Sequence, residues 1–279
     1  MGETLPKRPE NTLNDLDGKE WIQATKSWFI INPRSRKSDQ LQHPAKFPEE
    51  VAKRFVRFFT KENSWILDPF AGVGSTLIAC KEISRNSAGI ELNSDFVEIG
   101  NAYLKKARGE SRHEFIIGDA RDSVRLLRET FGENVPKFDY LLTSPPYWNM
   151  LRKSRGGSDS VHKEREEKGL KQHYSESSQD LGNILEYEKY IEEVGAILQS
   201  LKPILKPDAY LTVIVQNMRD VDGQMKPIAW DLARRISQDY WLQQEMIWCQ
   251  DNKKLGIWGY PTTYVSNVHH HTCLIFQNK

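Results

Sequence analysis

Short hydrophobic runs alternate with longer amphipathic stretches along most of this chain. Seven runs have the length and composition of buried strands: residues 65–68, 88–92, 114–117, 138–142, 210–215, 244–249 and 272–276. Helical spacing of apolar positions, as at Val51, Phe55, Phe58 and Phe59, predicts helices between most of the runs. The helices are expected to begin near Pro48 and to span 76–83, 95–106, 120–131, 185–201 and 227–239.

Strands separated by helices predict an α/β fold with a parallel sheet and right-handed crossovers. No helix is expected between the last two strands, so they pair as an antiparallel hairpin. The expected sheet therefore has seven strands, six of them parallel and the last reversed, with helices on both faces. Residues 26–31 are apolar enough for a further short strand or a docking segment.

The pattern divides the chain into two regions. Residues 1–42 form an N-terminal arm and docking segment, loose over the polar positions 1–18, and 43–279 form one domain. An insertion at about 151–183 is rich in charge, Gly and Ser, and a loop of that length is usually functional or mobile.

Composition and charge limit the kinds of protein that this chain can be. Hydrophobic residues make up 38% and charged residues 28% of the chain, which favours a packed core over disorder. The net charge of +1 gives no support to nucleic-acid binding, so any basic face must be local. Three scattered cysteines suggest a reducing compartment. Since we find neither a membrane-spanning run nor a signal peptide, we expect a cytoplasmic protein with no membrane association.

Acids and glycines stand at the ends of the first strands. Asp68 is followed by Gly72 and Gly74 in a strand-to-helix turn, which suits a nucleotide or adenosyl ligand. Leu77 occupies the position where a dinucleotide fingerprint has a third glycine, which disfavours a dinucleotide. Glu91 can accept hydrogen bonds from ribose hydroxyls, and Asp119 can accept one from an exocyclic amine. Both acids could instead cap the helices that follow them.

The strand at 138–142 runs into Thr-Ser-Pro-Pro-Tyr-Trp at 143–148. Two prolines end the strand and stiffen the chain, while a Ser hydroxyl and carbonyl oxygens point out of the sheet beside an aromatic ring. This arrangement suits the binding of a flat ring that carries an amine.

These motifs resemble those of the S-adenosylmethionine-dependent amino DNA methyltransferases, the N4/N6 DNA methylase family. The matching segments are His-Pro-x-x-Phe-Pro at 43–48, Asp-Pro-Phe-Ala-Gly-Val-Gly-Ser-Thr at 68–76, Gly-Ile-Glu-Leu-Asn at 89–93, Gly-Asp-Ala at 118–120 and Ser-Pro-Pro-Tyr at 144–147. The resemblance implies a Rossmann-like class I methyltransferase fold with S-adenosylmethionine as cofactor. It implies cofactor contacts from His43, Pro44, Phe47, Asp68, Phe70, Gly72, Gly74, Ser75, Thr76, Glu91, Leu92, Asp119 and Ala120.

Ser rather than Asp at position 144 favours the cytosine-N4 type, by analogy with the family. The expected catalytic residues are Ser144, Pro145, Pro146 and Tyr147. Ser144 and the Pro145 carbonyl would polarise the amine of a flipped-out cytosine, and Tyr147 would stack on the base. Adenine-N6 methylation of DNA, methylation of an RNA amine and non-catalytic nucleic-acid binding stay open as alternatives.

Further residues are candidates for DNA contact, with a solvated charged face or core packing as the alternative. They are Arg34, Arg36, Lys37, Trp148, Arg152, Lys153 and Arg155. The arm, residues 151–183 and the loop 251–268 could supply target recognition. Carbon-5 methylation is disfavoured because Cys249 lies in a strand pattern, and His269 to His271 show no zinc-ligand spacing, so no metal is expected. DNA is the expected partner, the protein is expected to be a monomer or homodimer, and the resemblance allows a cognate restriction endonuclease.

Overall fold

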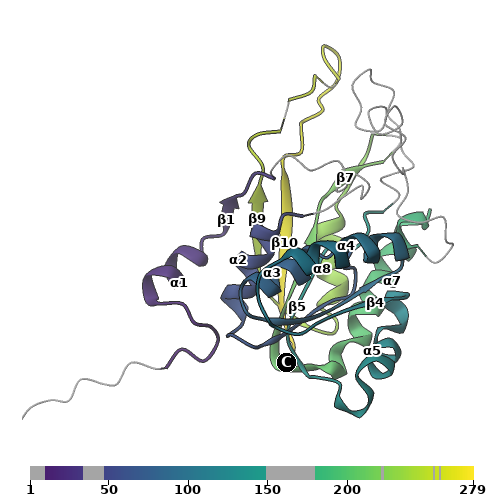
Figure 1. Ribbon diagram of the computed structural model, residues 1–279. Helices are drawn as coiled ribbons and strands as arrows, with labels where there is room; N and C mark the ends of the chain where they lie inside the picture. Colours follow the sequence, from purple (N-terminus) through teal and green to yellow (C-terminus); the bar gives the residue numbers. More distant parts are fainter. Residues whose placement is uncertain (1–9, 34–46, 149–179, 221–222, 254, 258) are drawn as a thin grey trace, which may run out of the picture.

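The computed structural model describes residues 10–33, 47–148, 180–220, 223–253, 255–257 and 259–279. Within these ranges the chain forms one large sheet with helices against both of its faces (Figure 1). The sheet order is β1-β9-β10-β6-β5-β2-β3-β4, and every neighbouring pair is parallel except those made by β10. The strands of this sheet are β1 (Trp28–Ile30), β2 (Trp65–Asp68), β3 (Asn86–Glu91), β4 (His113–Ile117), β5 (Phe138–Thr143), β6 (Leu205–Val215), β9 (Trp241–Cys249) and β10 (His270–Gln277).

The predicted α/β sheet and its antiparallel C-terminal hairpin are confirmed, but the count of seven strands is wrong by one. The eighth strand is β1, which pairs in parallel with β9 at the edge of the sheet. Only Phe29 of its three residues is buried, where its ring meets Phe55 edge-on at 5.8 Å between centroids. It lies within residues 26–31, so the short-strand alternative for that segment is confirmed, and the pairing with β9 decides between it and a docking segment.

Two sets of helices cover the two faces. The first comprises α1 (Gly18–Ala24), α2 (Glu49–Phe59), α3 (Ser75–Glu82) and α4 (Ser94–Lys106); the second comprises α5 (Ser123–Phe131), α7 (Tyr187–Ser200) and α8 (Ile228–Ile236). Short 3-10 turns lie at Ala120–Asp122, Gly132–Asn134, Leu181–Asn183 and Lys202–Ile204, and a small hairpin joins β7 (Met218–Arg219) to β8 (Met225–Lys226). Alternate strand residues enter the two cores: Ile66 packs with the α2 side and Leu67 with the α7 side.

The described part of the N-terminal segment is held against α2. Asn14 is buried and donates a hydrogen bond from its side chain to the Phe58 carbonyl at 2.6 Å. Asp15 pairs with Arg85 at 3.1 Å, and α1 begins with a capping box formed by Asp17 and Glu20. Residues 10–18 are therefore not the loose arm that their polarity suggests. Residues 1–9 and 34–46 lie outside the described residues.

Candidate active site

The carboxyl ends of the parallel strands lie at one edge of the sheet. At one point along this edge, successive strands of the chain stop adding to one side of β2 and begin adding to the other. From β2 the order runs outward through β3 to β4, whereas β5 and β6 lie on the other side of β2. The switch point therefore falls between β2 and β5. In open α/β sheets ligands bind outside the carboxyl ends of the strands at such a point. The two motifs that the sequence selects, at 68–76 and 144–147, follow these two strands directly.

Asp68 connects the two motifs. Its carboxylate is almost fully buried, and it accepts hydrogen bonds from the hydroxyls of Thr76 at 2.5 Å and Thr143 at 2.7 Å and from the Phe70 N–H at 3.1 Å. Burial raises the pKa of Asp68 to about 6, although the hydrogen bonds from Thr76 and Thr143 oppose that shift. Asp68 thus fixes the glycine turn, the start of α3 and the residue before Ser144 relative to one another.

The turn after Asp68 places main-chain groups at the N-terminus of α3. Gly72 has φ of 54° and Gly74 has φ of 81°, values that favour glycine. A Cβ on Gly74 would lie 3.1 Å from Cε1 of Phe115, so this position also has little room for a side chain. Ser75, the first residue of α3, donates its hydroxyl proton to the Phe47 carbonyl at 2.9 Å and so ties the turn to the segment before α2.

Glu91 closes the other side of the turn. One carboxylate oxygen accepts the Gly72 N–H and the other accepts the Asn93 N–H, each at 2.9 Å. Burial raises the pKa of Glu91 to about 7, against those two hydrogen bonds, and the nearby acids Asp180 and Asp68 raise it further. The side chain is only half-buried, and each of its oxygens has a second lone pair with which to accept a further donor.

Asp180 is a site residue that sequence reasoning missed. It is buried and lies close enough to Glu91 for its charge to act on that carboxyl group. Its side chain also accepts the Gly182 N–H at 2.8 Å and so caps the turn Leu181–Asn183. The sequence around it looks like the end of a charged loop, so only the folded chain brings it to β3.

Asp119 caps the turn that follows β4, which confirms the capping alternative. Its carboxylate accepts the Arg121 N–H at 2.9 Å and pairs with the Arg121 guanidinium at 2.9 Å. Ala120 beside it is buried in the core, whereas Leu92 is half-buried at the end of β3. A contact of these residues with an adenine ring remains a prediction, and His43 and Pro44 lie outside the described residues.

The strand tip after β5 is held from several sides. Ser144 donates its hydroxyl proton to the Ile214 carbonyl of β6 at 2.9 Å, and the Pro146 carbonyl accepts the Tyr190 hydroxyl proton at 2.9 Å. The Tyr147 hydroxyl is hydrogen-bonded to Ser144, and burial raises its pKa to about 12, so the phenol stays protonated. Ser144 donates its only proton to the Ile214 carbonyl, so its oxygen can act only as an acceptor toward other groups. A hydroxyl oxygen has two lone pairs, and one of them can accept a hydrogen bond from an incoming donor.

Trp148 lies in the hydrophobic core, where its indole meets the ring of Tyr187 edge-on at 5.2 Å. The core-packing alternative therefore describes its position in this structure. The six basic residues expected to contact DNA, Arg34, Arg36, Lys37, Arg152, Lys153 and Arg155, lie outside the described residues. Cys249 is half-buried at the end of β9, the strand in which the sequence places it.

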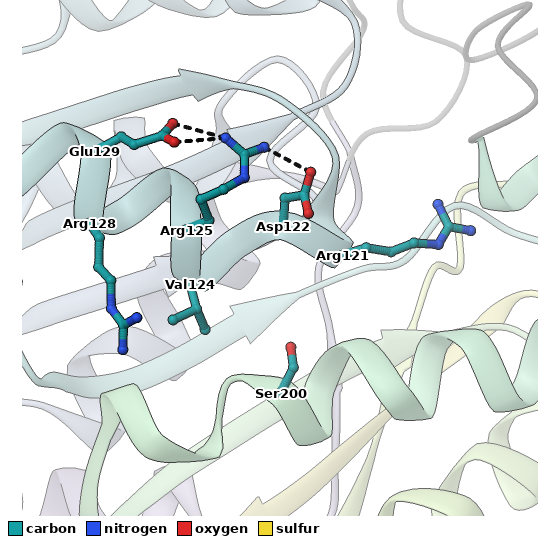
Figure 2. Close-up of a pocket in the computed structure, with 7 residues that line it drawn as sticks. All are labelled: Arg121, Asp122, Val124, Arg125, Arg128, Glu129 and Ser200. Atoms are coloured by element: carbon teal, nitrogen blue, oxygen red, sulfur yellow. Dashed lines mark hydrogen bonds and ion pairs between the residues drawn. The ribbon is translucent and has the colours of Figure 1, made fainter.

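A surface pocket of about 540 Å³ lies between α5 and the end of α7, and it contains none of the predicted site residues. Figure 2 shows Arg125 between Asp122 and Glu129 along its upper wall, with Ser200 opposite. The lining charges largely pair with each other. Among the described residues no group of three or more His, Cys, Asp or Glu side chains is placed to hold a metal ion. No helix in the described ranges is long and apolar enough to cross a membrane.

The residues at the switch point fit an adenosyl cofactor. The glycine turn adopts left-handed backbone conformations at the N-terminus of α3, where main-chain N–H groups favour an anionic ligand group, and the half-buried carboxylate of Glu91 has the acceptor capacity that ribose hydroxyls require. The sheet order, this turn and the proline-braced tip of β5 together define the Rossmann-like fold of the class I methyltransferases.

Comparison with known proteins gives the family. The chain belongs to the N6/N4 DNA methylase family, whose model, described as DNA methylase, matches residues 6–102 and 138–279. This match confirms the family that the motifs resemble and S-adenosylmethionine as its cofactor.

Similar proteins include several type II methyltransferases. The chain is 39% identical to M.HindIII of Haemophilus influenzae over 102 residues, which covers 36% of this chain and 33% of that protein. It is 35% identical to M.BglI of Bacillus subtilis over 102 residues, or 36% of this chain and 27% of that protein. The matched stretches thus span about a third or less of these relatives.

Solved structures with a similar fold include TrmN from Thermus thermophilus, with a TM-score of 0.49 and 12% identity over 82% of this chain and 47% of that one. A methyltransferase from Pyrococcus furiosus gives a TM-score of 0.44 and 13% identity over 82% of each chain.

Proposed function

We propose that this chain transfers a methyl group from S-adenosylmethionine to the exocyclic N4 amine of a flipped-out cytosine in DNA. The observation that carries the proposal is the position of Asp68, which hydrogen-bonds both Thr76 of the cofactor turn and Thr143, the neighbour of Ser144. A bound cofactor and a base at Ser144 would therefore share one cleft at the switch point.

The proposal gives each site residue a role that its contacts or its position support. Glu91 would accept the ribose hydroxyls, and the start of α3 would bind the methionine end. Bound S-adenosylmethionine supplies a methyl group that its positive sulfur has already activated. Ser144 and the Pro145 carbonyl would accept the two amine protons, so that the nitrogen lone pair turns toward that methyl. Ser is too weak a base to remove a proton, so the amine proton would pass to water once the N–CH3 bond has formed, and positioning and polarisation are the contribution of Ser144.

Adenine-N6 is the second candidate target, since the family includes both chemistries and the same tip would hold either amine. Ser144 in place of an acid supports cytosine. The role of DNA as substrate is supported by the family and by the relatives, which are type II methyltransferases. A cognate restriction endonuclease and a cytoplasmic location belong to the same proposal, and a monomer and a homodimer are equally compatible with it.

The loop between β9 and β10 supports contact with DNA beyond the target base. It leaves the sheet at the edge that carries Ser144, and Figure 1 shows it projecting away from that edge. Ile257, Tyr260 and Tyr264 on it are each more than 80% exposed. Aromatic and apolar side chains so exposed suit stacking or groove insertion, and the Gly256–Asn267 hydrogen bonds at 2.9 and 3.0 Å fix the base of the loop.

A nucleoside digest tests the proposal. The protein is incubated with methyl-labelled cofactor and unmethylated DNA, and the product is digested and separated. Label in N4-methyldeoxycytidine is the expected result. Label in N6-methyldeoxyadenosine would assign the enzyme to adenine instead. If a parallel reaction with RNA were the only one to give labelled nucleosides, DNA would be excluded as the substrate. No label in either nucleic acid would exclude catalysis. Tyr147→Ala is the matched variant, expected to bind cofactor normally and to lose most turnover.

A further inference from the structure

Three rings stand in a row at the catalytic edge. The ring of Tyr147 lies 6.3 Å from that of His271, centroid to centroid, and His271 stacks on Trp248 at 4.5 Å with 22° between planes. Trp248 is anchored in turn because its indole N–H donates to the Ile31 carbonyl at 2.8 Å. The row therefore links β1 and β9 to the ring that is expected to stack on the target base.

His271 occupies a special place in this row. It lies near the start of β10, directly opposite Trp248 of β9, so both side chains are on the face of the sheet that carries α2. Its residue exposure is 8%, yet its Nδ1 has no hydrogen-bond partner among the described residues. Burial lowers the pKa of His271 to about 3, and Lys253 and His270 lower it further, so the ring is neutral.

Gln250 is a second buried polar residue on the same face of the sheet. Its N–H donates to the His269 carbonyl, so it lies opposite His269 and diagonally across from His271. It follows Trp248 by two residues, so its side chain is on the same face as Trp248. It is 4% exposed, and its Oε1 also has no partner in the described part of the chain. Buried polar atoms nearly always have partners, so these two atoms, at diagonal positions on one face, are candidates to bond a polar ligand at this edge. Two other polar side chains near this edge do have partners: Ser144 donates to the Ile214 carbonyl, and Gln216 donates to the His270 carbonyl at 2.7 Å.

We propose that His271 is a specificity-determining residue that hydrogen-bonds the polar edge of the extruded base stacked on Tyr147, with Gln250 as its neighbour in that contact. This rests on the proposed function. A neutral imidazole can donate or accept, which suits an uncharged base edge, whereas a phosphate would favour a cation. The base edge is thus held from the sheet side while Ser144 holds the amine.

Ring-nitrogen NMR tests the contact without requiring catalysis. The protein is labelled with ring-15N histidine, and the signals of His271 are assigned from a His271→Asn sample. Adding oligo(dC) or oligo(dA) is expected to shift the His271 Nδ1 signal, and inorganic phosphate is not. No shift with either oligonucleotide, or an equal shift with phosphate, would overturn the proposal. If the protein transfers no methyl group to DNA, the proposed function fails, while this measurement still decides the site.

Kinetics of matched variants supply the second readout. His271→Phe keeps a stacking ring and removes both nitrogens, whereas His271→Asn retains a polar atom near the position of Nδ1. We expect kcat/KM for DNA to fall roughly 10-fold or more in His271→Phe, with partial rescue in His271→Asn and unchanged cofactor affinity. His270→Phe, one residue away on the exposed side, is the control and should match the wild type. Full activity of His271→Phe, or equal losses in both variants together with lower thermal stability, would leave only a packing role.

Discussion

The hydroxyl of Thr143 links the residue before Ser144 to Asp68, which begins the cofactor turn. It donates to Asp68 at 2.7 Å, and both residues are almost fully buried. Thr143→Val removes this hydroxyl while nearly preserving the volume of the side chain. One oxygen of Asp68 would then keep only the longer bond from the Phe70 N–H at 3.1 Å.

The size of the effect follows from the charge on Asp68. A buried hydrogen bond to an ionised group contributes about 1.5–3 kcal/mol, which corresponds to a decrease in Tm of roughly 3–10 °C for a chain of this size. Because the pKa of Asp68 is about 6, its carboxylate is ionised at about pH 8 and mostly protonated at about pH 5. A neutral bond is worth about half as much, so the Tm difference between variant and wild type should be smaller at about pH 5. Loss of the link should also lower kcat roughly 10-fold or more, since the reacting groups lose their relative position.

Thr212→Val is the matched control. Thr212 is equally buried on the neighbouring strand β6, and its hydroxyl accepts the proton of Tyr140 at 2.6 Å away from the cofactor turn. Thermal unfolding, cofactor titration calorimetry and methyl-transfer rates are measured for both variants. We expect both to lose stability, but only Thr143→Val to lose turnover. Normal turnover and normal cofactor affinity in Thr143→Val would refute the role of Asp68 as the connection between the two motifs.

Three further predictions concern single positions. Ser144→Ala should lower kcat roughly 100-fold with cofactor affinity unchanged in calorimetry, and an active variant would remove the mechanism. Glu91 has a pKa of about 7, and its ionised form is the better acceptor for ribose hydroxyls, so cofactor affinity should rise from about pH 6 to about pH 8. Glu91→Gln should bind more weakly and abolish that rise, whereas a rise that persists would assign it to another group. Gly100→Ala would place a Cβ 2.2 Å from Cε1 of Phe115 and should cost about 1–3 kcal/mol in chemical denaturation, while Gly18→Ala, with open space around it, should cost nothing measurable.

Periodicity alone was enough for most of the fold. Runs such as 65–68 and 138–142 end within a residue of β2 and β5, because strands buried on both faces require continuous apolar residues. Pattern was less decisive where elements are short. For β1, the apolar residues 26–31 left a short strand and a docking segment open, and for α1 the capping box of Asp17 and Glu20 was a readable signal that the polar composition concealed.

The candidate site also has a part that the sequence predicts and a part that it does not. Motif spacing was sufficient to select Asp68, Glu91 and Ser144, because strand-to-helix turns place such residues at the carboxyl edge whatever the rest of the chain does. The role of Asp68 as a bridge was not readable, since its partner Thr143 lies 75 positions away and meets it only because β2 and β5 pair in the sheet.

The sequence by itself determined the class of fold, the family and the two motifs that carry the chemistry, because these depend on local pattern and spacing. Only the tertiary structure decided which distant groups meet: Thr143 with Asp68, Asp180 with Glu91, and His271 with Tyr147 and Trp248. The physical reason is that strand order and register set these contacts, and both result from the packing of the whole sheet rather than from any one segment.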